Sequence, residues 1–253
     1  MSTKKILAIH GLGGHSGWFE RLRNELINFD IEIIAFDLPG FGKNHIELDA
    51  NSIYQKGHIE SYLEWKDFIR KKYAELKDQH GNVDILGHSL GAVLATSIDF
   101  DHSDKLILSV PGYKGAKETF NPFFVGKAFW HYAIDKTLLD KNVFIEMPIS
   151  EKDFDTPAIR DELRVGTVSQ NLLFQILKLG EVAKKKLQRI QNKVLMIQVE
   201  KDAVVDNKTQ DEYFDLIASN QKNKIVFTDT DHDWIWTDKN PEIAQAIASF
   251  INN

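Results

Sequence analysis

The chain of 253 residues has a formal net charge of −6 and contains no cysteine. Disulfides, thiolate metal sites and a cysteine nucleophile are therefore excluded. The acidic balance offers no electrostatic attraction to nucleic acid or to an anionic membrane surface. No stretch approaches the ~18 consecutive apolar residues of a membrane span, and the first apolar run is too short for a secretory signal. We expect a cytoplasmic protein with no nucleic-acid partner and no integral membrane association.

Short apolar runs rich in β-branched residues recur along the chain and predict buried parallel strands, because they are apolar on both faces. Helix-like stretches lie between most of them, so the pattern predicts an α/β fold with a mostly parallel, six-stranded sheet flanked by helices. The predicted strands cover residues 5–11, 31–37, 83–89, 105–111, 193–200 and 224–230, and the predicted helices cover 17–28, 52–78, 90–100, 207–219 and 240–252.

Residues 112–190 interrupt this alternation. They contain one strand candidate, at 143–149, and otherwise sequence typical of helices and loops. We interpret this segment as a helical lid or cap inserted into an α/β core made of residues 1–111 and 191–253. Its dense aromatic cluster would form the roof of a substrate pocket or the core of the lid itself. The aromatic residues that we assign to substrate contacts are Phe123, Phe124 and Trp130.

The sequence Gly87-His88-Ser89-Leu90-Gly91 follows a predicted strand and opens a predicted helix. A G-x-S-x-G pattern between a strand and a helix is typical of a nucleophile elbow, which exposes a serine on a strained turn. Glycines on either side of the serine let the strand and the helix approach each other closely. The alternative is a surface turn that contains a serine by chance. The flanking elements favour Ser89 as a nucleophile.

A serine hydroxyl needs a base to remove its proton and a carboxylate to orient that base. In folds with this elbow the order along the chain is serine, acid, histidine. His232 is the one histidine C-terminal to His131, and it follows the last predicted strand. Asp202 follows the preceding predicted strand by two residues and is the favoured acid, with Asp206 as the alternative.

Residues 9–18, IHGLGGHSGW, form a glycine-rich turn after the first predicted strand. Such a turn is similar to a dinucleotide-binding loop, and Asp37 lies near the position of a ribose-binding acid. An NAD-dependent oxidoreductase, however, would leave the serine, the acid and the histidine without a role. In a serine hydrolase the backbone N–H groups of Leu12 and Leu90 would instead form the oxyanion hole.

Asp229, Asp231 and Asp233 alternate around His232 in a pattern similar to the start of a calcium loop. Trp234 stands where that loop needs its glycine, and the distal glutamate is missing. We therefore predict neither a metal nor a cofactor.

Taken together, these segments resemble the α/β-hydrolase superfamily, and within it the monoacylglycerol lipase and lysophospholipase-like branch of serine aminopeptidase S33 type. HGLGGHSG is similar to the oxyanion loop of that branch, FDLPGFGKN to its D-x-x-G-x-G turn, GHSLGA to its nucleophile elbow and EKDAVVD to its acid loop. The first two strands of the family have no counterpart, and Lys43-Asn44 replaces the usual residues after the turn.

The resemblance implies a triad of Ser89, Asp202 and His232, an oxyanion hole at Leu12 and Leu90, and a lid over an acyl pocket. His15 is a further candidate for a substrate contact. We expect a serine hydrolase that cleaves carboxylic esters, with a small acyl or aryl ester as substrate and monoglycerides or lysophospholipids as the lipid-derived candidates.

The same triad would serve a thioesterase, an amidase or aminopeptidase, a carbon–carbon bond hydrolase or a perhydrolase, because fold and triad do not determine the acyl donor. A non-catalytic binding protein and an NAD-binding oxidoreductase are the alternatives from other classes. The sequence leaves the oligomeric state open.

Overall fold

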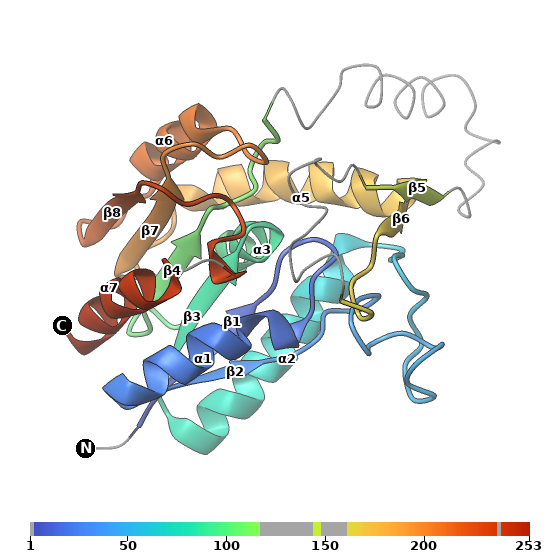
Figure 1. Cartoon of the computed structure of the whole chain (residues 1–253), viewed down its shortest axis with the longest axis horizontal. Coiled ribbons are helices and arrows are strands. Elements are labelled where there is room, and N and C mark those ends of the chain that lie inside the picture. Colours follow the sequence, from blue (N-terminus) through green and yellow to red (C-terminus); the bar gives the residue numbers. More distant parts are fainter. Residues whose placement is uncertain (1–2, 117–143, 148–160, 237–238) are drawn as a thin grey trace.

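The computed structural model describes residues 3–116, 144–147, 161–236 and 239–253 (Figure 1). Within this part of the chain, six strands form the central sheet: β1 (Lys4–Ile9), β2 (Ile31–Ala35), β3 (Val83–His88), β4 (Leu106–Ser109), β7 (Val194–Val199) and β8 (Lys222–Phe227). Their order is β2-β1-β3-β4-β7-β8, and every neighbouring pair is parallel. The predicted α/β fold with a six-stranded parallel sheet is confirmed.

Helices cover both faces of this sheet. On one face, α1 (Glu20–Leu26) and α7 (Asn240–Asn252) pack against Ile6 and Ala8 of β1. On the other face, the hydrophobic cluster contains Leu7 and Ile9 of the same strand. The alternation follows from the two-residue period of a strand, and it explains why the strand is apolar on both sides. The second helical layer consists of α2 (Tyr62–His80), α3 (Leu90–Ser97), α5 (Gln170–Leu187) and α6 (Asn207–Leu216).

The start of α2 differs from the prediction, which placed it at residue 52. The helix begins at Tyr62, where Ser61 and Glu64 form a capping box. The Ser61 hydroxyl accepts a hydrogen bond from Leu63 N–H at 3.3 Å, and the Glu64 carboxylate accepts one from Ser61 N–H at 2.9 Å. Because these side chains satisfy backbone donors at the first turn, they fix where the helix starts.

A second, two-stranded sheet lies in the segment that we interpret as an insertion. β5 (Phe144–Glu146), which the sequence predicted, pairs antiparallel with β6 (Thr167–Ser169), which it did not. α5 follows β6 directly and lies beside α3 (Figure 1), with Leu172 and Leu179 buried in the same cluster. The division into a core and an inserted lid stays a prediction, and the predicted aromatic contacts Phe123, Phe124 and Trp130 lie outside the described residues.

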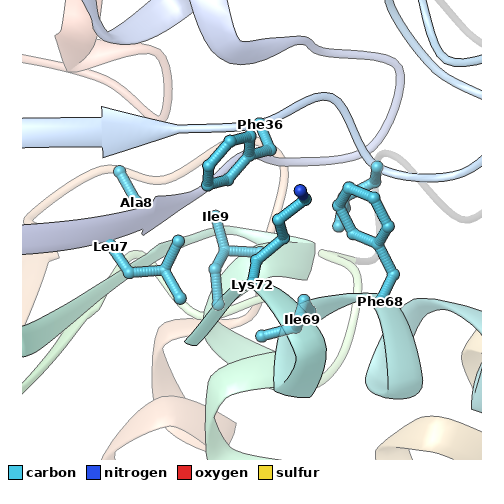
Figure 2. Close-up of a pocket in the computed structure, with 8 residues that line it drawn as sticks. Leu7, Ala8, Ile9, Phe36, Phe68, Ile69 and Lys72 are labelled. Carbon is cyan, nitrogen blue, oxygen red and sulfur yellow. The ribbon is translucent and has the colours of Figure 1, made fainter. Parts of the chain in front are cut away.

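Figure 2 shows a small apolar pocket between β1 and α2. Lys72 points between the rings of Phe36 and Phe68 there, with its ammonium group 4.8 Å from the centre of the Phe36 ring. The pocket contains none of the three residues of the predicted triad, so we assign it no role in chemistry. Among the helices that the structure describes, none combines the length and the apolar character needed to cross a membrane.

Candidate active site

Ser89 lies in the turn between β3 and α3, with φ 53° and ψ −117°. A residue with a side chain rarely adopts this backbone conformation, which is a source of strain at functional turns. Hydrogen bonds hold it in place: Ser89 N–H donates to Ser109 O at 2.9 Å, and Ser89 O accepts from Ala92 N–H at 3.0 Å. Since Leu90 begins α3, the positive end of the helix dipole lies next to the Ser89 side chain.

The glycines of the elbow are required by close backbone contacts. A Cβ atom at Gly91 would lie 2.0 Å from Ile9 O, and one at Gly87 would lie 2.4 Å from Gly91 O. Both distances are far shorter than any van der Waals contact, and backbone atoms cannot rotate out of the way as a side chain can. Glycine is therefore needed two residues before and two residues after Ser89 because the strand and the helix pack too closely there for any side chain.

Gly91→Ala is expected to destabilise the protein by about 1–3 kcal/mol or more, because the added methyl group overpacks the contact between α3 and β1. Urea or thermal denaturation measures the change. Gly166→Ala is the matched control, since a Cβ there meets no atom within 4 Å, and its effect should stay within about 0.5 kcal/mol. Equal stability of the two variants would contradict the packing argument.

Loops at the carboxyl ends of β7 and β8 bring Asp202 and His232 to Ser89. His232 Nε2 lies 2.9 Å from Ser89 Oγ, and His232 Nδ1 lies 2.9 Å from Asp202 Oδ2. The other carboxylate oxygen accepts hydrogen bonds from Val204 N–H and Val205 N–H, each at 2.9 Å. With Nδ1–H donating to the carboxylate, Nε2 is free to accept the serine proton. The structure thus brings the three predicted residues into one hydrogen-bonded chain.

The alternative acid, Asp206, lies elsewhere. It precedes α6, where its Oδ2 accepts a hydrogen bond from Thr209 Oγ1 at 2.6 Å and lies 3.8 Å from Lys114 Nζ. The geometry therefore favours Asp202 as the partner of His232.

The charge environment of His232 stabilises its protonated form. Burial lowers the pKa of His232, but the hydrogen bond and negative charge of Asp202, together with the charges of Asp233 and Asp231, outweigh burial and raise the pKa above its ordinary value. Asp202 is fully buried, with a side-chain exposure of 0%. An imidazolium that forms during a reaction would therefore find its counter-charge already in position.

Three further residues lie next to the hydrogen-bonded chain of Ser89, His232 and Asp202, and the sequence did not assign them to the site. The ring of His88 lies 5.5 Å from that of His232 and 6.1 Å from that of Trp234, centre to centre. Trp234 Nε1–H donates to Ser109 Oγ at 2.8 Å. Burial is the main cause that holds the pKa of His88 well below its ordinary value, and the charges of His232 and His10 lower it further. His88 therefore adds no positive charge beside His232. His88 and Trp234 adjoin predicted site residues, but no sequence signal marks Ser109.

The two predicted oxyanion-hole donors come from two different segments, the loop after β1 and the first residue of α3. A Cβ atom at Gly11, just before Leu12, would lie 3.1 Å from Ser89 Cβ, so this loop touches the serine. In the described part of the chain, no hydrogen bond involves the backbone N–H of Leu12 or of Leu90. Both donors are thus available to an external oxygen atom, as an oxyanion hole requires.

His10 connects the oxyanion loop to the turn after β2. His10 Nε2 accepts a hydrogen bond from Leu38 N–H at 3.0 Å, so Nδ1 carries the proton and donates to Gly11 O at 2.8 Å. Burial lowers the pKa of His10 to about 4, which keeps the ring neutral at physiological pH. His10 therefore braces the loop, because its one ring proton is held by Gly11 O and its other nitrogen accepts from Leu38 N–H.

His15, the predicted substrate contact, has partners on both ring nitrogens. Nδ1 accepts a hydrogen bond from Gly17 N–H at 3.1 Å, and Nε2 bonds the carboxylate of Asp161. A hydrogen bond from His15 to a substrate would have to replace one of these. The substrate contact stays a prediction.

One group of described side chains, His88, His232 and Asp233, places possible metal ligands within 4.8 Å of one another. Both nitrogens of His232 already bond Ser89 and Asp202, so a metal there would break the chain of hydrogen bonds. We assign no metal to these residues.

Two curated proteins match about a third of this chain. A probable serine hydrolase of Drosophila melanogaster is 36% identical over 89 residues, which cover 35% of this chain and 24% of that protein. Monoglyceride lipase of Homo sapiens is 32% identical over 90 residues, which cover 36% of this chain and 28% of that protein. The matched stretches therefore span less than a third of the length of either relative.

Solved structures share the fold over the whole chain. Monoacylglycerol lipase of Paleococcus ferrophilus superimposes with a TM-score of 0.78 at 22% identity, covering 99% of this chain and 96% of that one. A soluble variant of monoglyceride lipase of Saccharomyces cerevisiae gives 0.79 at 18% identity, covering 99% and 86%. The family described as serine aminopeptidase, S33, matches residues 2–240. The chain therefore belongs to the serine aminopeptidase S33 family and has the predicted α/β-hydrolase fold.

Proposed function

We propose that this protein is a serine hydrolase that cleaves carboxylic esters through an acyl-enzyme on Ser89. The observation that carries the proposal is the chain of two 2.9 Å hydrogen bonds from Ser89 through His232 to a buried Asp202. A serine of ordinary reactivity has no need of a strained turn, a base and a buried counter-charge together. Membership of a family of serine hydrolases supports the same conclusion.

In the first half of the reaction, His232 Nε2 takes the proton of Ser89 as Oγ bonds to the ester carbonyl carbon. The carbonyl oxygen becomes an oxyanion that accepts hydrogen bonds from Leu12 N–H and Leu90 N–H. His232 then gives its proton to the alkoxy oxygen, the C–O bond breaks and the alcohol leaves. The acyl group remains on Ser89 as an ester.

Water completes the cycle. His232 Nε2 takes a proton from a water molecule as its oxygen attacks the acyl carbon, and a second tetrahedral intermediate forms. Collapse of that intermediate breaks the bond to Ser89 Oγ, which recovers a proton from His232, and the carboxylic acid is released. Asp202 keeps the imidazole oriented and stabilises its charged form in both halves.

For the substrate class, we propose an acyl ester of lipid origin, such as a monoglyceride. This rests on the monoglyceride and monoacylglycerol lipases among the similar proteins and on the aromatic residues of the predicted lid. Amide cleavage is the second candidate, because the description of the family names an aminopeptidase.

A fluorophosphonate is expected to form one stable adduct, on Ser89, because its phosphorus is attacked by an activated serine and the adduct resembles the tetrahedral intermediate. Mass spectrometry of the peptide that contains residues 83–97 locates the adduct. Ester turnover by a protein whose Ser89 stays unlabelled would contradict the proposal.

A panel of substrates then decides between the two bond types. We expect the highest kcat/KM for p-nitrophenyl esters and a monoglyceride, and a lower value for a lysophospholipid. An aminoacyl p-nitroanilide tests the second candidate. A higher kcat/KM for the anilide than for every ester would show that the amide is the preferred bond.

A further inference from the structure

Residues 161–169, here called the returning strap, lie against the loop that carries Leu12. Val165 N–H donates to Gly13 O at 2.9 Å. Gly13 has φ +74°, and a Cβ atom there would lie 2.6 Å from Met147 Cε and 2.8 Å from Val165 O. The approach is so close that only glycine fits. Leu12, the proposed oxyanion donor, comes directly before this contact.

The carboxylate of Asp161, at the start of the strap, accepts hydrogen bonds from side chains of the same loop. Its Oδ2 accepts hydrogen bonds from His15 Nε2 and, at 3.0 Å, from Trp18 Nε1–H, while its Oδ1 accepts one from Leu163 N–H at 2.9 Å. Burial raises the pKa of Asp161, but these hydrogen bonds outweigh burial and leave the pKa below its ordinary value. A charged carboxylate with partners on both oxygens is a strong and directional attachment point.

The far end of the strap is itself fixed to the body of the protein. Ser169 N–H donates to Gly57 O at 2.9 Å, and Ser169 Oγ lies 2.7 Å from His58 Nδ1. Ser169 also caps α5, where it accepts a hydrogen bond from Leu172 N–H at 3.1 Å. Hydrogen bonds therefore anchor the end of the strap that is distant from Asp161.

A second attachment of the loop does not involve the strap. Asp37 accepts hydrogen bonds from Ser16 N–H and Lys43 N–H, each at 2.7 Å. The loop thus has one support from the turn after β2 and another from the strap. A misplacement of about 1 Å can cost about 10²-fold in rate, so the support of an oxyanion donor by two separate segments has a direct bearing on the reaction.

We propose that Asp161 is a positioning residue that holds Leu12 N–H in place for the oxyanion. It does so through its hydrogen bonds to His15 and Trp18, here called the clamp, so His15 acts as part of the clamp. The inference rests on the proposed function, because it needs Leu12 to be an oxyanion donor. It differs from the sequence interpretation of His15, in which the imidazole touches the substrate.

Asp161→Ala is expected to lower kcat by about 10- to 100-fold, part of the loss that follows removal of a whole oxyanion donor. KM should change by less than about 3-fold, since the donor acts on the transition state. The affinity for an alkyl boronic acid, which forms a tetrahedral adduct with Ser89, should fall by the same factor as kcat/KM. The acidic limb of the pH profile should stay in place, because His232 is untouched.

A double-mutant cycle separates the clamp from a substrate contact. If His15 and Asp161 act together, His15→Ala combined with Asp161→Ala should lose no more activity than the worse single variant. If His15 binds substrate by itself, the two losses should multiply, and KM should rise in His15→Ala. Multiplicative losses would overturn the assignment of His15.

Two further variants guard against a general loss of structure. Asp161→Asn keeps the shape of the side chain and one of the two acceptor oxygens but loses the negative charge, and we expect a smaller loss of kcat than for alanine. Asp99→Ala removes an exposed carboxylate that pairs with Lys186, and its kinetics should match the wild type. Unchanged kcat and boronic-acid affinity in both Asp161 variants would overturn this inference alone. A wild-type protein without ester turnover would overturn the proposed function and this inference together.

Discussion

Replacement of Ser89 by alanine is expected to lower kcat for ester hydrolysis by about 10⁶-fold, the loss typical of removing the nucleophile of a triad. No other described hydroxyl is hydrogen-bonded to His232, so no substitute nucleophile is in position. The oxyanion donors and the binding surface remain, and these alone sustain about 10³- to 10⁴-fold catalysis over water. Initial rates with a p-nitrophenyl ester measure the change, with the variant purified on unused resin to exclude traces of wild type.

The control for this variant is Ser249→Ala, which removes a hydroxyl on the exposed side of α7. Its kcat should equal that of the wild type within a factor of two or so, since surface substitutions of this kind perturb stability little. Both variants should unfold at nearly the same temperature. Turnover by Ser89→Ala within about 10-fold of the wild type would mean that another group attacks the ester, and the acyl-enzyme on Ser89 would have to be abandoned.

The sheet and the three residues of the hydrogen-bonded chain could be predicted from the sequence because each depends on a local pattern. Buried parallel strands need apolar residues on both faces, and the elbow needs glycine on both sides of Ser89. Asp202 and His232 could be predicted because the carboxyl ends of parallel strands meet at one edge of a sheet. The strand bounds were less exact: β8 begins at Lys222 and ends at Phe227, which leaves a longer loop to carry His232.

Features that depend on contacts between distant segments could not be predicted. β6 has three residues, too few for a periodic pattern, and it exists because β5 pairs with it. The same holds for Asp161, which lies 146 residues from His15 and has no motif of its own. Ser109 looks like an ordinary residue at the end of a buried strand, and only the folded chain shows its hydrogen bond to Trp234.

Asp202→Asn is expected to lower kcat by about 10⁴-fold, the loss seen when an amide takes the place of the carboxylate in a triad. The amide can present a donor to His232 Nδ1, which would favour the tautomer with a proton on Nε2, and such an imidazole cannot accept the serine proton. Asp206→Asn is the matched control, because its carboxylate bonds Thr209 and lies outside the chain of hydrogen bonds. Its kcat should change by no more than a few-fold.

The pH profile of the same two variants tests the electrostatic role of Asp202. Its carboxylate raises the pKa of His232 through a hydrogen bond and through charge. Asn at this position removes both contributions, so the pKa of His232 falls. The base stays neutral to lower pH, and the acidic limb of kcat/KM moves to lower pH while the plateau drops. Asp206→Asn should leave the limb where it is. A larger loss of kcat for Asp206→Asn, or an acidic limb that moves to higher pH in Asp202→Asn, would show that a different carboxylate supports His232.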